Sequence, residues 1–88
     1  MASVSDAQAA AYAALAVVRR NYFVNVRFKN FSGVKAKAKI DGDVIRITLG
    51  DAYASASSEV IEGIALSLFG KMFRVRVTHP SLRAYKEF

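Results

Sequence analysis

Hydrophobic and polar residues alternate strictly over residues 34–49, on both sides of an Asp41-Gly42 pair. Because successive side chains of a strand point to opposite faces, this pattern predicts two strands that each have one apolar and one polar face. Asp-Gly between two alternating runs is typical of a β-hairpin with a type I′ turn, in which both central residues have a positive φ. Lys35, Lys37 and Lys39 fall on one face of the first strand, opposite Val34, Ala36, Ala38 and Ile40, and Ile45, Ile47 and Leu49 alternate with Val44, Arg46 and Thr48 in the second.

Two other stretches have a helical period. The Ala- and Leu-rich stretch from about Asp6 to Tyr22 predicts a helix, because these residues are the strongest helix formers. A second helix is expected to begin near Ser57 or Ser58, which can each cap it, and to end near Arg74. Its apolar residues cover so much of its circumference that we expect it to be buried from more than one side. The first helix has Ala11, Leu15, Val18 and Tyr22 on its core side, and the second has Val60, Ile64, Leu68, Phe69 and Met72, widened by Ile61, Ala65 and Leu66.

The remaining segments complete an α+β fold in one domain, residues 1–88. Residues 23–31 predict a short strand with Val24, Val26 and Phe28 on one face, and the turn residues after it suggest that it joins the hairpin as an antiparallel meander. Residues 50–58 form a loop of small residues, and residues 81–88 a last turn or short helix. The expected order is an N-terminal helix, a three-stranded antiparallel sheet with a hairpin, a second buried helix and a short C-terminal element.

The composition is basic. The 88 residues include 13 Lys and Arg against 7 Asp and Glu, which gives a net charge of +6 and a pI near 10.0. This balance favours polyanionic partners, nucleic acid first and an anionic membrane surface second, although a charge of this size also occurs in small domains for solubility alone. The longest apolar run, residues 9–18, is about half of a membrane span, so no membrane-spanning segment and no membrane partner are expected. The absence of cysteine fits a cytoplasmic location.

The sequence offers little for catalysis or for metal binding. His79 is the single histidine, it precedes a proline, and there is no cysteine. A zinc site and a nucleophilic triad both need more such groups than this, and no glycine-rich phosphate loop is present. Asp41 and Asp43 are interpreted as turn residues. We therefore expect no enzymatic activity, no cofactor, no metal and no catalytic residue.

The strongest candidate for function is the set of basic residues on the predicted sheet. Lys35, Lys37, Lys39 and Arg46 share one face of the hairpin, and Arg27 and Lys29 join them if the strands pair in register. Such a row can contact phosphates, but it is equally expected of an ordinary solvated sheet face. Asn25, Phe31, Tyr53 and Tyr85 could add stacking or hydrogen bonds, and a second cluster of Arg74, Arg76, Arg83 and Lys86 could extend the surface or be a polar rim.

The order of elements resembles the core of SprT-like and related minimal zinc metallopeptidases, from about Leu15 to Phe73. The likeness rests on hydrophobic pattern and spacing. The second helix of that family carries a His-Glu-x-x-His zinc motif, and by this placement its positions hold Glu62, Gly63 and Leu66, without a histidine. The resemblance therefore implies a relic scaffold without metal or peptidase activity. The matching segments are Asn21-Tyr22-Phe23, Val26-Arg27-Phe28, Ala36 and Ala38, residues 44–49, and SSEVIEGIALSLFGKMF.

These observations lead us to expect a non-catalytic, small basic RNA-binding protein, a component or accessory of a ribonucleoprotein such as the ribosome, with RNA favoured over DNA. One alternative is a protein-interaction module on the relic metallopeptidase-like scaffold, which would dock through an apolar surface that includes Val44, Ile61 and Phe73. Another is a DNA-coating protein, because it would share the same electrostatics. The expected nucleic-acid-binding residues are Arg27, Lys29, Lys35, Lys37, Lys39, Arg46, Arg74 and Arg76.

Overall fold

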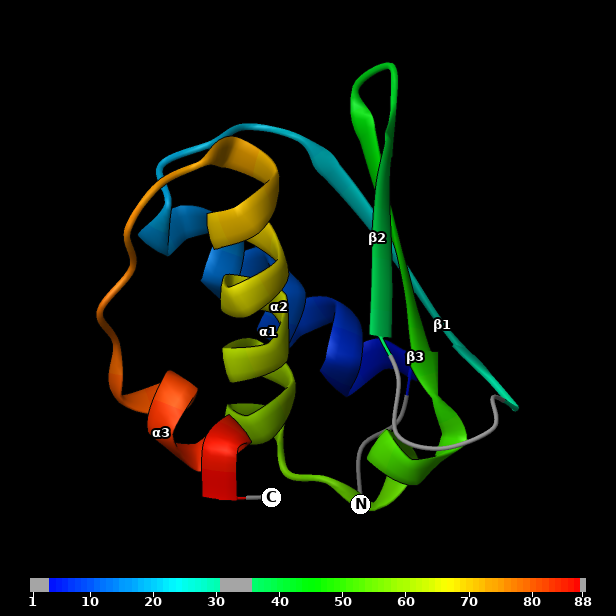
Figure 1. Ribbon diagram of the computed structural model, residues 1–88. Coiled ribbons are helices and arrows are strands. Elements are labelled where there is room, and N and C mark those ends of the chain that lie inside the picture. The colour runs from blue at the N-terminus through cyan, green and yellow to red at the C-terminus, as the bar shows by residue number, and fades with distance from the viewer. Residues whose placement is uncertain (1–3, 31–35, 88) are drawn as a thin grey trace.

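The fold is α+β, as the sequence predicts. The structure is a computed structural model that describes residues 4–30 and 36–87. The helices α1 and α2 lie against one face of a three-stranded sheet, and α3 lies beside α2 on the side away from the sheet (Figure 1). No described helix is long and apolar enough to cross a membrane. The elements are α1 (Val4–Val17), β1 (Phe23–Lys29), β2 (Ala36–Asp41), β3 (Val44–Gly50), the 3₁₀ helix η1 (Asp51–Ser55), α2 (Ser58–Phe73) and α3 (Pro80–Glu87).

The sheet is mixed, so the prediction of a purely antiparallel meander is wrong. The strand order is β1-β3-β2, with β1 parallel to β3 and β2 antiparallel to β3. The apolar face explains why β3 is central: Ile45, Ile47 and Leu49 are almost completely buried. Strand β2 offers two alanines, which are half-buried, and Ile40, which is 38% exposed, and such residues suit an edge. The chain therefore places its most apolar strand between the other two.

The hairpin itself is confirmed, but its turn is shifted by one residue. Asp41 pairs with Val44, so that Gly42 and Asp43 are the two central residues. Of these two, Gly42 alone has a positive φ, of 64°. A glycine at the first central position is typical of a type II′ turn, whereas the predicted type I′ turn needs a positive φ at both positions. The alternation of faces is unaffected, because both strands keep their predicted inward and outward residues.

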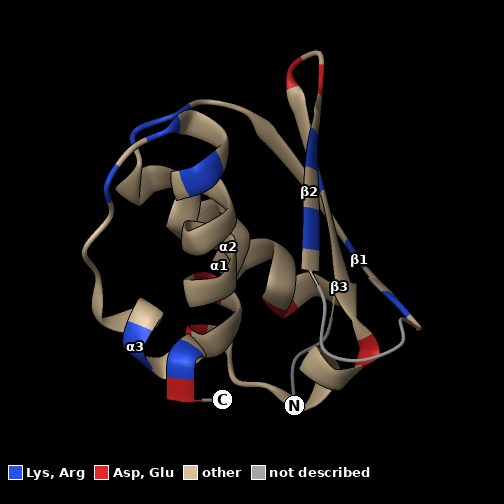
Figure 2. Ribbon diagram, viewed as in Figure 1, with Lys and Arg blue, Asp and Glu red and all other residues tan. Residues whose placement is uncertain are grey.

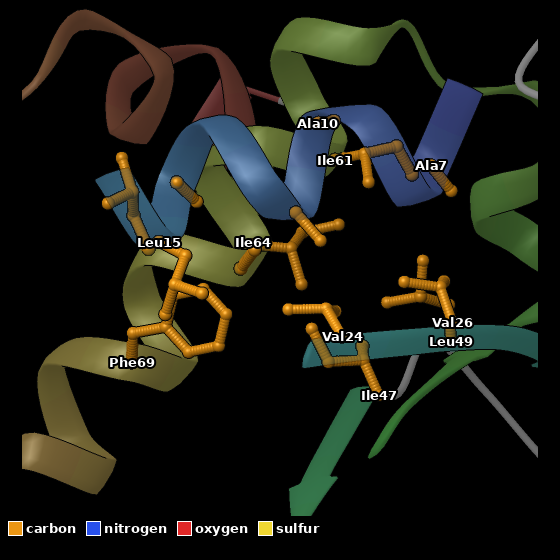
Figure 3. Close-up of a cluster of buried hydrophobic side chains, with 14 of the residues drawn as sticks. Ala7, Ala10, Leu15, Val24, Val26, Ile47, Leu49, Ile61, Ile64 and Phe69 are labelled. Atoms are coloured by element: carbon orange, nitrogen blue, oxygen red, sulfur yellow. The ribbon is translucent and has the colours of Figure 1, made fainter. Parts of the chain in front are cut away.

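The core lies between the sheet and the two long helices (Figure 3). Val24 and Ile47 of the sheet point toward Ile64 of α2, and Leu15 of α1 lies beside Phe69 of α2. Helix α2 contacts α1, α3 and β2, which confirms that it is buried from several sides. Leu68 and Met72, which were expected in its core stripe, are half-buried instead.

Both long helices end on an arginine in a left-handed conformation. Helix α1 ends at Val17, before the predicted Tyr22, because Arg19 has a φ of 56°. The N–H of Arg19 donates to the carbonyl of Ala16 at 3.1 Å and that of Arg20 to the carbonyl of Leu15 at 3.3 Å, which is a Schellman motif. Arg74 ends α2 with a φ of 55°. Glycine usually occupies such positions, since any other residue is strained there by about 1 kcal/mol.

Helix α1 also caps the outer edge of β1. The N–H of Val24 donates to the hydroxyl of Tyr12 at 3.0 Å, and the N–H of Val26 donates to Oε1 of Gln8 at 3.0 Å. The amide nitrogen of Gln8 donates in turn to the carbonyl of Val24. An exposed strand edge invites pairing with another chain. These side chains occupy backbone groups of Val24 and Val26, so that this part of the edge is closed to a further strand.

Helix α3 is held against α2 at a glycine. A side-chain Cβ at Gly63 would lie 2.1 Å from the carbonyl oxygen of Ser81, so the two backbones approach too closely for any other residue. Nδ1 of His79 accepts a hydrogen bond from the N–H of Ser81 at 3.2 Å and lies 2.8 Å from its hydroxyl. His79 is therefore the N-terminal cap of α3, with Pro80 at the first helical position.

Candidate nucleic-acid interface

Basic side chains from all three strands share the face of the sheet that is turned away from the helices. Strand side chains alternate between faces, so the residues that flank the buried positions point outward. We call this surface the cationic sheet face. Its basic residues are Arg27 and Lys29 of β1, Lys37 and Lys39 of β2, and Arg46 of β3, and all five are exposed (Figure 2).

The strand register arranges these residues in rows across the sheet. Lys39 lies opposite Arg46, which in turn lies opposite Asn25. The next outward row joins Lys37, Thr48 and Arg27. Neighbouring strands lie about 4.8 Å apart, and alternate residues of a strand about 7 Å apart. The basic groups therefore form a grid with spacings at which successive backbone phosphates can be contacted.

The contacts within this face leave its charge accessible. Arg27 Nε donates a hydrogen bond to Oγ1 of Thr48 at 3.3 Å, and the guanidinium of Arg46 lies 3.4 Å from a carboxylate oxygen of Asp41. Both members of this ion pair are about two-thirds exposed, at 67% and 63%, so the pair is weak and a phosphate can replace it. A shallow hollow of about 540 Å³ lies on the face and is lined by Arg27, Lys37, Ala38, Lys39, Asp41, Arg46 and Thr48.

The predicted binding residues fall into separate groups. Five of the eight form the cationic sheet face, and Lys35 lies outside the described residues. Arg74 and Arg76 do not reach the sheet face. They lie where α1 and α2 end, together with Arg19, Arg20 and Lys71 (Figure 2). We call these five residues the helix-end cluster. The sequence analysis did not predict that Arg19, Arg20 and Lys71 belong with Arg74 and Arg76, because only the packing of α1 on α2 brings the two helix ends together.

The other basic and aromatic candidates lie elsewhere. Arg83 is on α3 and forms an exposed ion pair with Glu87 at 3.4 Å. Tyr53 is 4% exposed, which rules it out as a platform for a base. Burial raises the pKa of Tyr53, and the neighbouring Tyr85 raises it further through its charge and a hydrogen bond. Asn25 does lie on the cationic sheet face, and Phe31 is outside the described residues.

Two of the three positions at which the resemblance places a zinc motif are part of the packed interior. Leu66 is completely buried, and Gly63 lies directly against the backbone of α3. No cluster of three or more potential metal ligands is found within residues 4–30 and 36–87. Nδ1 of His79 already accepts a hydrogen bond from the N–H of Ser81.

Comparison of the chain with protein-family models, with curated proteins and with solved structures finds no match. The functional argument therefore rests on the chemistry of the surfaces themselves.

Proposed function

We propose that the chain is a non-catalytic RNA-binding protein whose cationic sheet face contacts the phosphate backbone, within a larger ribonucleoprotein assembly. The observation that carries this proposal is the strand order. Because β3 lies between β1 and β2, Arg46 of the central strand is flanked on both sides by basic strands. Among the outward residues of the described strands, Asp41 is the one carboxylate, and it already pairs with Arg46.

Contacts to phosphates position a protein on nucleic acid without reading its sequence. The residues of the cationic sheet face match this task, since most of them are lysines and arginines that offer charge and donors. The alternative of an apolar docking surface is less well supported, because Ile61 is 1% exposed and cannot contribute to it. Phe73, another member of that surface, is occupied by Tyr22 and by the guanidinium of Arg20, which lies 5.0 Å from the ring centre.

The test is the salt dependence of RNA binding. A structured RNA hairpin would be titrated with the protein between 50 and 200 mM salt, and a DNA duplex of matching sequence would show whether RNA is preferred. Each phosphate contact contributes about 0.7–0.9 to the slope of log affinity against log salt. We therefore expect the double variant Lys37→Gln/Lys39→Gln to bind more weakly, with a slope lower by about 1.4–1.8.

A second double variant provides a control of equal charge. Arg83→Gln/Lys86→Gln also removes two positive charges, but from α3 rather than from the sheet. If binding follows net charge alone, the two double variants will lose affinity equally, and the proposed role of the sheet face is wrong. The same conclusion follows if the wild-type protein shows no salt-dependent binding. Circular dichroism of each variant would verify that the fold is kept.

A further inference from the structure

The helix-end cluster is a second cationic surface, and it borders the sheet where Lys71 of α2 and Lys37 of β2 line one hollow. It contains Arg19 and Arg20 after α1, Lys71 in the last turn of α2, and Arg74 and Arg76 after it. All five residues are exposed. Figure 2 shows them gathered at the upper left of the molecule, whereas the basic residues of the sheet lie at the right.

No acidic residue balances the helix-end cluster. All seven acids of the chain are described, and they lie at the opposite ends of the helices, in the hairpin turn, in η1 and at the end of α3. No ion pair joins a carboxylate to any of the five cations within the described residues. The positive potential of this end is therefore reduced mainly by the C-terminal dipoles of the two helices.

Stability alone does not account for arginine at two of these positions. Arg19 and Arg74 have φ angles of 56° and 55°. Glycine adopts this conformation without strain, and it is the usual residue at the end of a helix. A cation near a helix C-terminus is favourable, but it can be placed at a neighbouring position without the strain. Strained residues that persist in a fold point to a role in binding.

We infer that the protein bridges two RNA segments, one bound by the cationic sheet face and the other by the helix-end cluster. This inference rests on the proposed function, because it takes the first RNA to lie on the sheet. The helix-end cluster would also bind phosphates, because it has five cations and no acidic residue beside them. The guanidinium of Arg20 lies 5.0 Å from the centre of the Phe73 ring, which orients this cation. The Cα framework measures 27 × 27 × 21 Å, and the basic residues of the sheet and those of the helix ends lie at different sides of it (Figure 2).

The experiment uses two copies of one RNA hairpin, one with biotin and one with a fluorophore. Capture of the biotinylated RNA retains fluorescence only when the protein holds both. Two variants separate the surfaces: Arg19→Gly/Arg74→Gly/Arg76→Gln for the helix-end cluster, and Lys37→Gln/Lys39→Gln for the sheet. The two glycine substitutions relieve strain, so we expect the first variant to unfold at a higher urea concentration than the same protein with Arg76→Gln alone. A loss of bridging in this variant then reflects lost cations and not lost structure.

We expect the wild-type protein to capture the fluorescent RNA, and each variant to bind one RNA but to capture at least about tenfold less at 0.1 M salt. An equal mixture of the two variants should not restore capture. Restoration would mean that a protein dimer makes the bridge, and it would overturn the inference.

The remaining outcomes distinguish this inference from the proposed function. If the wild-type protein binds one RNA without capturing a second, bridging is wrong and the sheet proposal stands. If the sheet variant binds RNA as well as the wild type does, the proposed function is wrong. Vesicles of phosphatidylglycerol and phosphatidylcholine test a membrane as the partner of the helix-end cluster. Bridging is overturned if the helix-end variant loses vesicle binding while its capture of RNA is unchanged.

Discussion

The close approach of α3 to Gly63 predicts a large effect of a small substitution, Gly63→Ala. The new Cβ atom would lie 2.1 Å from the carbonyl oxygen of Ser81 and 2.7 Å from Cβ of Tyr85. Ordinary contacts of this kind begin at 3.4 Å, so α3 must move by about 1.3 Å (3.4 − 2.1) or leave α2. The obstructing oxygen belongs to the backbone of a helix, and it cannot rotate aside as a side chain does.

Two opposing terms determine the size of the effect. Alanine is more favourable than glycine inside a helix by about 1 kcal/mol. Overpacking costs about 1–3 kcal/mol, and an obstructing backbone atom places this site in the upper part of that range. We therefore expect Gly63→Ala to lower the free energy of unfolding by about 1–2 kcal/mol, although the same substitution is normally stabilising in a helix.

Gly70 on the same helix provides the control. A Cβ at Gly70 would lie 3.3 Å from the carbonyl oxygen of Val75 and 3.6 Å from Cγ2 of Val77, which small adjustments can accommodate. Gly70→Ala should leave stability unchanged or raise it by up to about 1 kcal/mol. Urea unfolding of both variants measures the difference, and hydrogen exchange should show faster exchange in α3 for Gly63→Ala alone. Equal stability of the two variants would refute the reasoning.

Three further predictions concern contacts outside the core. Gln8→Met should lower the free energy of unfolding by about 1–2 kcal/mol in urea, because backbone groups of β1, including the N–H of Val26, lose their partner. His79→Ala should lower it by about 1 kcal/mol through loss of the cap on Ser81, whereas His79→Asn, which can still cap, should lose less. The pKa of Tyr53 is raised by burial, and secondly by Tyr85, above the ordinary value of 10.0. Folding therefore favours the neutral phenol of Tyr53. Its contribution to the free energy of unfolding is complete below about pH 10 and is lost as the pH rises through the folded-state pKa. Thermal unfolding between pH 8 and 12 should show this loss, and Tyr53→Phe should reduce it.

Each of these predictions has a contrary result. If Gln8→Met has the same free energy of unfolding as the wild-type protein, water replaces the hydrogen bonds of Gln8 to β1 without loss of stability. If His79→Asn and His79→Ala unfold alike, the ring nitrogen does not act as a cap. If Tyr53→Phe loses as much stability at alkaline pH as the wild-type protein, another group is responsible for the loss.

Much of the fold follows from local pattern. The alternation over residues 36–49 determined the hairpin and the face on which each of its residues lies, because a period of two leaves no other arrangement with a buried face. The apolar stretch over residues 58–73 similarly determined a helix enclosed on several sides. These features depend on residues close together in the chain.

The candidate surfaces depended more on tertiary structure. Pattern assigned Arg27 and Lys37 to outward faces, but strand order is a competition among long-range pairings, and burial of Ile45, Ile47 and Leu49 decided it in favour of a central β3. The residues that follow β1 in the sequence gave no sign of this strand order. As a result, the basic residues of β1 and β2 flank β3 instead of standing next to each other.

The helix-end cluster also could not be predicted from the local sequence, because it depends on long-range packing. Arg19 and Arg74 are separated by most of the chain, and the local sequence shows each of them only as a cation near a helix end, without the strained φ that the structure gives it. The packing of α1 on α2 places both helix ends at one side of the molecule. The amino-acid sequence by itself determined which residues are charged and which way each strand faces. The packing of distant elements decided that the charges form two surfaces, because only burial of the shared core fixes where those elements lie.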